Sequence, residues 1–392
     1  MRRFTISLLP IFDLRWAAAA ILCIMLFALG ITTCRAQSWT MVITMADGTT
    51  QELPTADIRE ISYVEQTLTL DDQNVDQILI KEVYNGGVML DDGTRNFQAD
   101  KCIILYNNCG QQAVVNNLCF GFCTPYNAQG QNHNYADDGT LTYELQGFIP
   151  ALEGIWYYPH SLVIPPYSQV VVNVQGAIDN TQTVSQSVNY ANAGYYCMYD
   201  PESGYNNTNY YPTPADVIPA SHYLKAIRYG LSNAWALSVT APALFIFQTQ
   251  GETPDAFASG ADNQWYDGGT IQASGHCVKV PVDWIIDGVE IFTTSKPDDC
   301  RKRLTADIDA GYVWLTNQQG HSLYRNVDKQ MTEELPENQG RLVYNYALGV
   351  GQSTDPSGID AEASIKNGAR IIYQDTNNST ADFHERQRCS LR

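Results

Sequence analysis

Short apolar segments rich in Val, Ile and aromatic residues recur along the sequence, and Gly, Pro, Asn or Asp separate them. Segments of this length and composition are typical of β-strands rather than helices. Because turn-forming residues punctuate them so often, we predict a mainly β protein, with an Ig-like β-sandwich as the architecture. The expected strands are residues 78–84, 102–106, 113–115, 162–164, 170–174, 243–248, 277–282, 284–292, 312–315 and 370–373.

Helical patterns are sparse. Residues 220–229 (ASHYLKAIRY) are the strongest candidate for a short helix, and residues 254–258 are expected to form one turn. The stretch at about 179–275 is rich in Asn, Tyr and Gly and shows weaker periodicity. We therefore predict a long, loop-rich insertion there, between two halves of the sandwich.

The first 36 residues have the pattern of a secretory signal peptide. Basic residues precede Trp16–Thr33, an 18-residue run without charge, and small residues follow it. Two alternatives are a retained membrane anchor, because the run just reaches spanning length, and lipidation at Cys34. All three place the protein outside the cytoplasm: at the cell surface, associated with the outer membrane, or in the periplasm. No later run is apolar enough to predict a membrane span after signal removal.

Residues 37–70 predict a small β-hairpin unit. Thr40–Met45 and Thr49–Leu53 flank an Asp-Gly turn, and Ile58–Val64 is a third expected strand. The remaining chain, residues 75–392, is expected to form the main domain.

Charge and motifs exclude several functions. The net charge is −19, so nucleic acid is not an expected partner. The eight cysteines after residue 36 include no CxxC pair, which favours buried thiols or one or two disulfides over a metal site. The motifs of P-loop, Rossmann, serine-hydrolase and zinc-protease sites are absent from the sequence. We therefore predict neither a cofactor nor a metal.

Two acidic features of the sequence bear on catalysis or calcium binding. Asp307 and Asp309 would lie on one face if this segment is extended. Such a pair suits the two carboxylates of a glycosidase or two calcium ligands, although a solvent-exposed face is the simpler interpretation. Residues 71–83 match the EF-hand loop poorly, which leaves at most a loose calcium site in a loop.

Clustered aromatic residues are the more suggestive pattern. They lie in segments expected to be loops or insertion, with Asn and Asp nearby. Flat apolar area beside hydrogen-bonding groups suits a sugar-binding or protein-binding face, although Tyr also packs under loops. The candidate binding residues are Trp156, Tyr157, Tyr158, Tyr210, Tyr211, Trp265 and Tyr266.

Residues 78–120 resemble the opening of lamin-tail-like domains, in which a strand carrying Glu precedes a strand that closes on Leu-Tyr-Asn. Here the matching residues are Glu82 and Leu105–Asn107. Residues 322–325 and 375–383 resemble that family's closing segments, and Phe383 is expected in the core.

More broadly, residues 78–392 resemble a Bacteroidota family of secreted proteins, catalogued as a domain of unknown function and related to the lamin tail. Segments 154–182, 195–212 and 303–317 carry this resemblance, and residues 45–63 resemble a short module at the start of other surface proteins of that phylum. The resemblance implies export to the cell envelope, a lamin-tail-like sandwich, and binding or anchoring rather than catalysis.

These observations predict a non-enzymatic binding or adhesion module of the cell envelope that engages a surface protein or a glycan through loop aromatics. Two alternatives stay open. One is an accessory subunit of an outer-membrane uptake system, partnered with an outer-membrane barrel. The other is a glycosidase that uses Asp307 or Asp309.

Overall fold

A computed structural model describes residues 40–44, 50–54, 77–269 and 271–392. The chain divides into two units, residues 1–68 and 69–392. In the first, β1 (Thr40–Thr44) pairs antiparallel with β2 (Thr50–Pro54), which confirms the two predicted hairpin strands. The signal segment, Cys34, the third hairpin strand and the acidic run at 71–76 lie outside the described residues.

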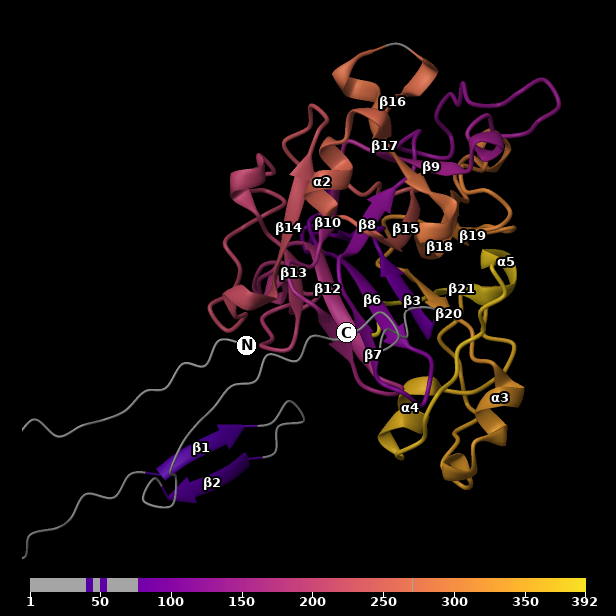
Figure 1. Cartoon of the computed structure of the whole chain (residues 1–392). Helices are drawn as coiled ribbons and strands as arrows, with labels where there is room; N and C mark the ends of the chain where they lie inside the picture. The colour runs from indigo at the N-terminus through magenta and orange to yellow at the C-terminus, as the bar shows by residue number, and fades with distance from the viewer. Residues whose placement is uncertain (1–39, 45–49, 55–76, 270) are drawn as a thin grey trace, which may run out of the picture. The chain divides into compact units, whose positions relative to one another are not determined.

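The second unit is built on one twelve-stranded sheet that is nearly closed (Figure 1). At its two ends β19 contacts β21, and β18 also contacts β3, so the sheet curls back on itself. The pairs β12–β13, β13–β14 and β18–β19 are parallel, and the other neighbours are antiparallel. The strand order is β19 (Val313–Leu315), β18 (Ile285–Thr293), β15 (Ala243–Gln248), β8 (Leu118–Phe122), β10 (Gly154–Tyr157), β14 (Tyr223–Arg228), β13 (Tyr196–Met198), β12 (Gln169–Gln175), β6 (Lys101–Asn107), β3 (Ile78–Tyr84), β20 (Ser322–Arg325) and β21 (Phe383–Arg386).

Smaller elements cover this sheet. Three strands, β16 (Gln264–Tyr266), β17 (His276–Pro281) and β9 (Phe148–Leu152), form one small sheet. Two-stranded pairs are β11 (Leu162–Ile164) with β7 (Ala113–Val115), and β4 (Val88–Met89) with β5 (Asn96–Phe97). The α-helices among the described residues are short: α2 (Pro254–Ser259), α3 (Lys329–Glu334), α4 (Ala361–Lys366) and α5 (Ser379–Asp382).

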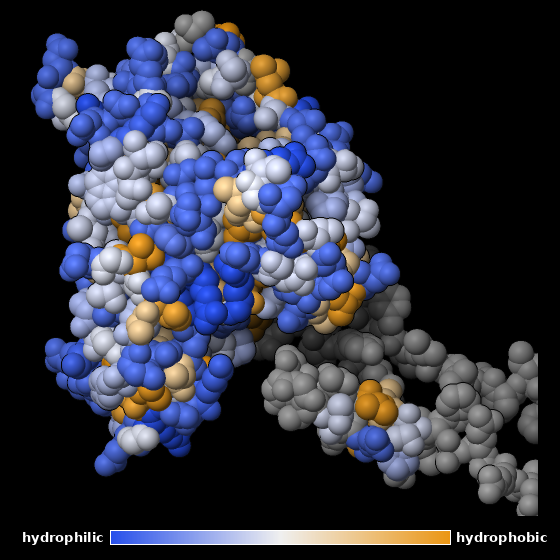
Figure 2. Space-filling view, turned by 180° about the vertical axis from the view of Figure 1, so that it is seen from behind, coloured by the Kyte–Doolittle hydropathy of each residue, from blue (hydrophilic) through white to orange (hydrophobic). Residues whose placement is uncertain are grey.

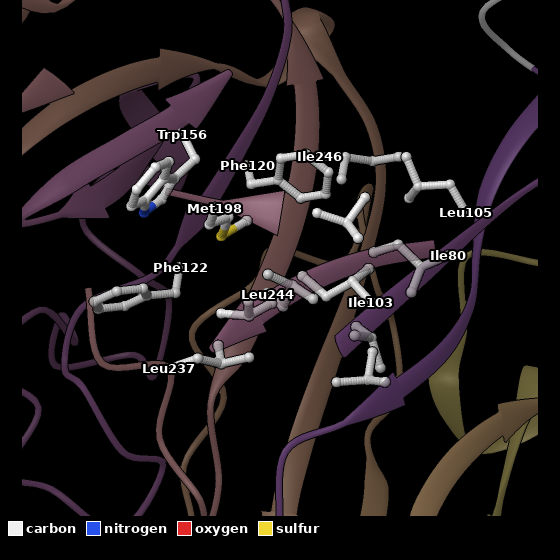
Figure 3. Packing of buried hydrophobic residues seen from close by; sticks show 14 of the residues in the cluster. Ile80, Ile103, Leu105, Phe120, Phe122, Trp156, Met198, Leu237, Leu244 and Ile246 are labelled. Atoms are coloured by element: carbon white, nitrogen blue, oxygen red, sulfur yellow. The ribbon is translucent and has the colours of Figure 1, made fainter. Parts of the chain in front are cut away.

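Side chains inside the curled sheet form the main core (Figure 3). Strand alternation sends every second residue inward. The inward side chains come from both ends and the middle of the sheet, so this single core holds the closed shape. On the opposite, outer face of β8, Gly121 is required because a Cβ atom would lie 2.6 Å from Cζ of Phe245. The inward residues include Ile80, Ile103, Leu105, Phe120, Phe122, Trp156, Leu244, Ile246 and Phe383.

A second core lies on the outer face, where the small sheet β16–β17–β9 packs over β8, β10 and β15. Phe245 and Phe247 of β15 contribute to it from the main sheet, and Ile149 and Val280 contribute from the small sheet. Phe257 of α2 joins the same cluster, and the Thr253 side chain caps that helix by accepting a hydrogen bond from the Ala256 N–H. Because the small sheet packs on the main sheet, the ends of β9, β16 and β17 are held in place, and the loops leave them at the upper end of Figure 1.

The sheet closes through a buried network centred on Arg325 of β20, which we call the Arg325 network. A β-bulge in β3 between Ile80 and Glu82 interrupts its ladder, and the Ile80 N–H donates instead to Oδ2 of Asp287 on β18, at 2.6 Å. Arg325 donates to the same carboxylate, to the Ile80 carbonyl at 2.8 Å, and to Oδ1 of Asp375 at 3.0 Å. Side-chain hydrogen bonds thus join β18 to β3 and β20, to which no backbone ladder connects it.

The mainly β prediction is confirmed, and many strand positions are confirmed with it, including 78–84, 113–115, 162–164 and 243–248. The segment at 179–275 differs from the prediction. It supplies β13, β14, β15 and β16, so it is part of the sheets rather than a loop-rich insertion. β13 and β16 have three residues each, which is too short to show alternation in the sequence.

The helix predicted at 220–229 is wrong. Residues 220–222 form one 3₁₀ turn, and residues 223–228 form β14. Both edges of β14 are paired, and Leu224 faces the main core while Ile227 faces the outer core. Tertiary pairing therefore overrides the local helical preference. Residues 370–373 also form no strand, although Tyr373 makes an isolated bridge to Val327.

Polar side chains at the ends of three strands hold a crossing segment at 235–238. Asn85 donates to the Ser238 carbonyl at 2.7 Å, and Lys101 Nζ donates to the Leu237 carbonyl at 2.5 Å. Gln175 donates to the Trp235 carbonyl at 3.3 Å. Lys101 is fully buried, and burial lowers its pKa to about 7 from an ordinary value of 10.5.

This shift predicts a pH-dependent stability. Between pH 7 and about 10.5 the unfolded chain binds the Lys101 proton and the folded protein does not, so this residue makes the free energy of unfolding rise with pH. Lys101→Met should remove up to about 1.4 kcal/mol per pH unit from that slope. Urea unfolding at several pH values from 7 to 10 measures the slope, and the exposed Lys296→Met is the control. Equal slopes for wild type and Lys101→Met would refute the assignment.

Candidate functional site

Two adjoining hollows lie along the segment at 129–142. One is where this segment meets the segment at 265–275, and the other is where it meets Asp299 and Arg301. The first, the Trp265 hollow, has a volume of about 760 Å³. The second, the Tyr135 hollow, has a volume of about 800 Å³, and Gln131 lines both. The walls are mostly amides, hydroxyls and carboxylates. The Trp265 hollow is lined by Gln131, His133, Asn134, Thr142, Trp265 and Asp267, among others.

The carboxylate of Asp267 joins the two segments. Its Oδ1 accepts a hydrogen bond from Asn134 Nδ2 at 2.8 Å, and its Oδ2 accepts one from Thr124 Oγ1 at 3.1 Å. Asn134 is buried, so its amide is fixed in the wall. Asp267 directly follows β16, and the strand therefore sets where this carboxylate lies. The wall of the hollow is held in place before any ligand arrives.

Trp265 supplies the aromatic surface of the first hollow. It lies on β16 and is half-buried, with its ring edge-on to Tyr143 at 6.3 Å and to Phe148 at 6.0 Å between centroids. Both neighbours belong to the outer core. Trp265 is among the residues that line the hollow, and these two ring contacts hold its indole beside the polar groups of the wall.

Two residues that line the Tyr135 hollow, Gln129 and Asn132, carry buried polar atoms without partners in the described part of the chain. Tyr135 donates to the Lys302 carbonyl at 2.6 Å, and burial raises the pKa of its hydroxyl. Oε1 of Gln129 and Nδ2 of Asn132 make no hydrogen bond to the described residues. One is an acceptor and the other a donor, and each unpaired group costs about 1–3 kcal/mol.

The predicted aromatic residues do not form one face. Trp156, Tyr158 and Tyr211 are 0%, 3% and 5% exposed, so they belong to the main core and cannot present a binding surface. The expectation that these three lie in exposed loops is therefore wrong. Trp156 is on the central strand β10, with its ring stacked 5.6 Å from that of Tyr205.

The other four candidates are half-buried. Tyr157 donates a hydrogen bond to Asp255 at 2.9 Å, and Tyr266 stacks on His276 at 4.7 Å. Tyr210 packs against the main core. Of the seven residues, Trp265 is the one that lines either hollow.

The acidic pair does not form a joint site. Asp309 is fully buried, and its carboxylate accepts hydrogen bonds from the Glu290, Gly311 and Ser379 N–H groups. Burial raises its pKa. Asp307 is exposed in a turn. The interpretation that both carboxylates face one open site is therefore wrong, because Asp309 is used to hold α5 against β18.

Sequence reasoning missed the polar wall of the hollows. Residues 127–140 (NAQGQNHNYADDGT) form one dense run of amide, hydroxyl and acidic side chains, which is the signal that the sequence offers. In the described part of the chain, no group of three or more His, Cys, Asp or Glu side chains is placed to hold a metal ion. Among those same residues, no helix has the length and apolar character needed to cross a membrane.

The fold and the hollows define a mainly β protein with a polar concave site. Residues 165–346 match the family model described as "Protein of unknown function (DUF4876)". The whole fold is similar to a crystal structure of a DUF4876 family protein from Bacteroides thetaiotaomicron, with a TM-score of 0.56, 17% identity, and coverage of 88% of this chain and 81% of that chain. At this identity the similarity concerns the fold. The search of curated proteins found no match.

Proposed function

We propose that this protein binds a neutral oligosaccharide in the Trp265 hollow, with the Tyr135 hollow accepting neighbouring sugar units. The observation that carries the proposal is the fixed indole of Trp265 inside a wall of amides and hydroxyls. A sugar ring has an apolar face that packs on an aromatic ring, and hydroxyls that pair with amide and carboxylate groups.

Charge and surface character favour a neutral glycan. Three carboxylates, those of Asp137, Asp267 and Asp299, line the hollows against one guanidinium, that of Arg301. Together with the net charge of −19, this excess of negative charge disfavours anionic ligands. On the face shown in Figure 2, hydrophobic residues occur in scattered spots rather than in one broad patch of the kind that marks a protein interface. Gln131 lines both hollows, so they adjoin, which suits an extended ligand.

The biological setting of this proposal is the cell envelope. The expected signal segment at 1–36 and the resemblance to secreted Bacteroidota proteins support export, with a role in binding rather than catalysis. As part of the same proposal, we regard the main sheet as related to the Ig-like sandwich of lamin-tail-like domains. A role as accessory subunit of an outer-membrane uptake system remains compatible, since such a subunit would present a glycan to its partner.

The test is titration calorimetry with a panel of neutral hexasaccharides: α-glucan, β-glucan, xylan and mannan, with a hyaluronan hexasaccharide as the acidic comparison. We expect at least one neutral sugar to bind and the acidic one not to bind. Trp265→Ala should weaken that binding about tenfold or more, because it removes the stacking surface. Ser274→Trp should block the hollow.

The matched control is Trp314→Ala. Trp314 is also half-buried among aromatic residues, but it lies on β19 and lines neither hollow. The Trp314→Ala variant should bind the neutral hexasaccharide with the affinity of the wild type. Absence of binding by every neutral hexasaccharide, or equal affinity for Trp265→Ala and wild type, would overturn the proposal.

A further inference from the structure

The C-terminal segment packs against the outer face of β3 and β6. The Ser390 N–H donates to Oε1 of Glu82 at 2.9 Å, and the Ser390 hydroxyl donates to the other oxygen of the same carboxylate. Ser322 of β20 donates to the Arg388 carbonyl at 3.1 Å. These contacts bring residues near the end of the chain onto strands near its start.

Two cysteines meet at this contact. The Sγ atoms of Cys102 on β6 and Cys389 are 3.9 Å apart, although the residues are 287 positions apart in the chain. Both side chains are fully buried, in a cluster with Tyr84, Ile104 and Tyr190. None of the other six cysteines in the described part of the chain makes a hydrogen bond to a second sulfur.

We propose that Cys102 and Cys389 form a disulfide that fixes the C-terminal segment to β6. The two sulfurs need to approach by about 1.9 Å to reach the bond length of about 2.05 Å. In the reaction each thiol loses one proton and the pair loses two electrons. A small-molecule disulfide such as oxidised glutathione accepts them, its S–S bond breaks, and two molecules of the reduced thiol are released.

The environment of Cys389 sets when the bond forms. Burial, and then the neighbouring sulfur of Cys102, raise the pKa of the Cys389 thiol well above its ordinary value. Exchange requires a thiolate, so the folded protein reacts slowly. The bond therefore forms before the segment around Ser390 packs onto Glu82, and dithiothreitol reduces it when that segment opens on heating.

The test is refolding of the reduced protein with oxidised glutathione, followed by alkylation of free thiols and peptide mapping. We expect one peptide pair linked through Cys102 and Cys389, and a loss of about 2 Da from the intact mass. The melting temperature should rise by about 5 °C or more relative to the reduced protein, because the bond closes a very long loop. Recovery of both residues as free thiols in the refolded protein would overturn the proposal.

Two variants separate this bond from a general effect of reducing agent. In Cys389→Ser, dithiothreitol should no longer change the melting temperature. Cys197→Ser is the matched control, because Cys197 is equally buried on β13 without a sulfur partner, and this variant should keep the full sensitivity to dithiothreitol. A Cys389→Ser variant that still loses stability in dithiothreitol would contradict the assignment, and linkage of Cys389 to a different cysteine would do the same. Peptide mapping of the wild-type protein tests the proposal even if one of the variants fails to fold.

Discussion

Arg325→Met is expected to lower the free energy of unfolding by about 3–5 kcal/mol. Arg325 is fully buried, and its guanidinium is the cation beside the buried carboxylate of Asp287. Burial raises the pKa of that carboxyl group to about 7, even with Arg325 present to lower it. Removing the cation leaves an unpaired buried acid and two unmatched carbonyl groups at the line where the sheet closes.

Urea unfolding measures this loss, with Arg370→Met as the control. Arg370 forms an ion pair with Glu337, but both side chains are more than one-third exposed, so its removal should cost less than about 1 kcal/mol. The double variant Arg325→Met with Asp287→Leu should regain part of the stability, because the buried Asp287 carboxylate is removed together with its cation. Recovery should be incomplete, since Asp375 and Asp382 still lose their ion pairs with Arg325. A loss from Arg325→Met equal to that from Arg370→Met would show that the Arg325 network does not hold the closed sheet.

Glu290→Ala is the second substitution with a large expected effect, again about 3–5 kcal/mol. Glu290 of β18 and Arg303 are both fully buried, and Oε1 accepts from the guanidinium at 2.6 and 2.9 Å. Oε2 accepts from the backbone N–H groups of Arg303 and Leu304. Truncation would therefore leave one cation and two backbone donors without partners.

The same pair positions one wall of the proposed site. Arg303 Nη1 donates to the Pro125 carbonyl at 2.9 Å, and Tyr143 donates to the Arg303 carbonyl at 2.5 Å. Both contacts tie the segment that carries Tyr135 to β18. We expect Glu290→Ala to increase hydrogen exchange in residues 125–143 as well as to lower the denaturation midpoint. Glu290→Gln, which keeps one acceptor oxygen, should have a smaller effect, and equal effects for the two variants would contradict the role of the ion pair.

The sequence predicts the isolated strands well, because runs such as 78–84 and 243–248 are long, apolar and bounded by turns. It does not predict which strands are neighbours, since β8 pairs with β15 across more than 100 residues. The local pattern at β14 favours a helix, and the strand forms because both of its edges pair with distant parts of the chain. The closed sheet follows from such pairings and from the Arg325 network, neither of which leaves a local pattern.

The candidate site was only partly visible in the sequence. Trp265 was singled out as an aromatic residue, but so was Trp156, and nothing local distinguishes a core Trp from one on a surface. The difference arises from their strands: β10 is central in the main sheet, whereas β16 is at the edge of the small outer sheet. The polar wall comes from a segment more than 100 residues before Trp265, and the Asn134–Asp267 hydrogen bond joins the two.

Hydrogen–deuterium exchange of the protein with and without the tightest-binding neutral hexasaccharide tests the central claim most directly. A sugar bound in the hollows should slow exchange in peptides covering residues 129–142 and 264–269, with no change in peptides from β12, β13 or α4. That result would place the ligand beside Trp265. Protection confined to another region, such as the half-buried tyrosines at 195–223, or no protection at a saturating sugar concentration, would contradict the proposed site.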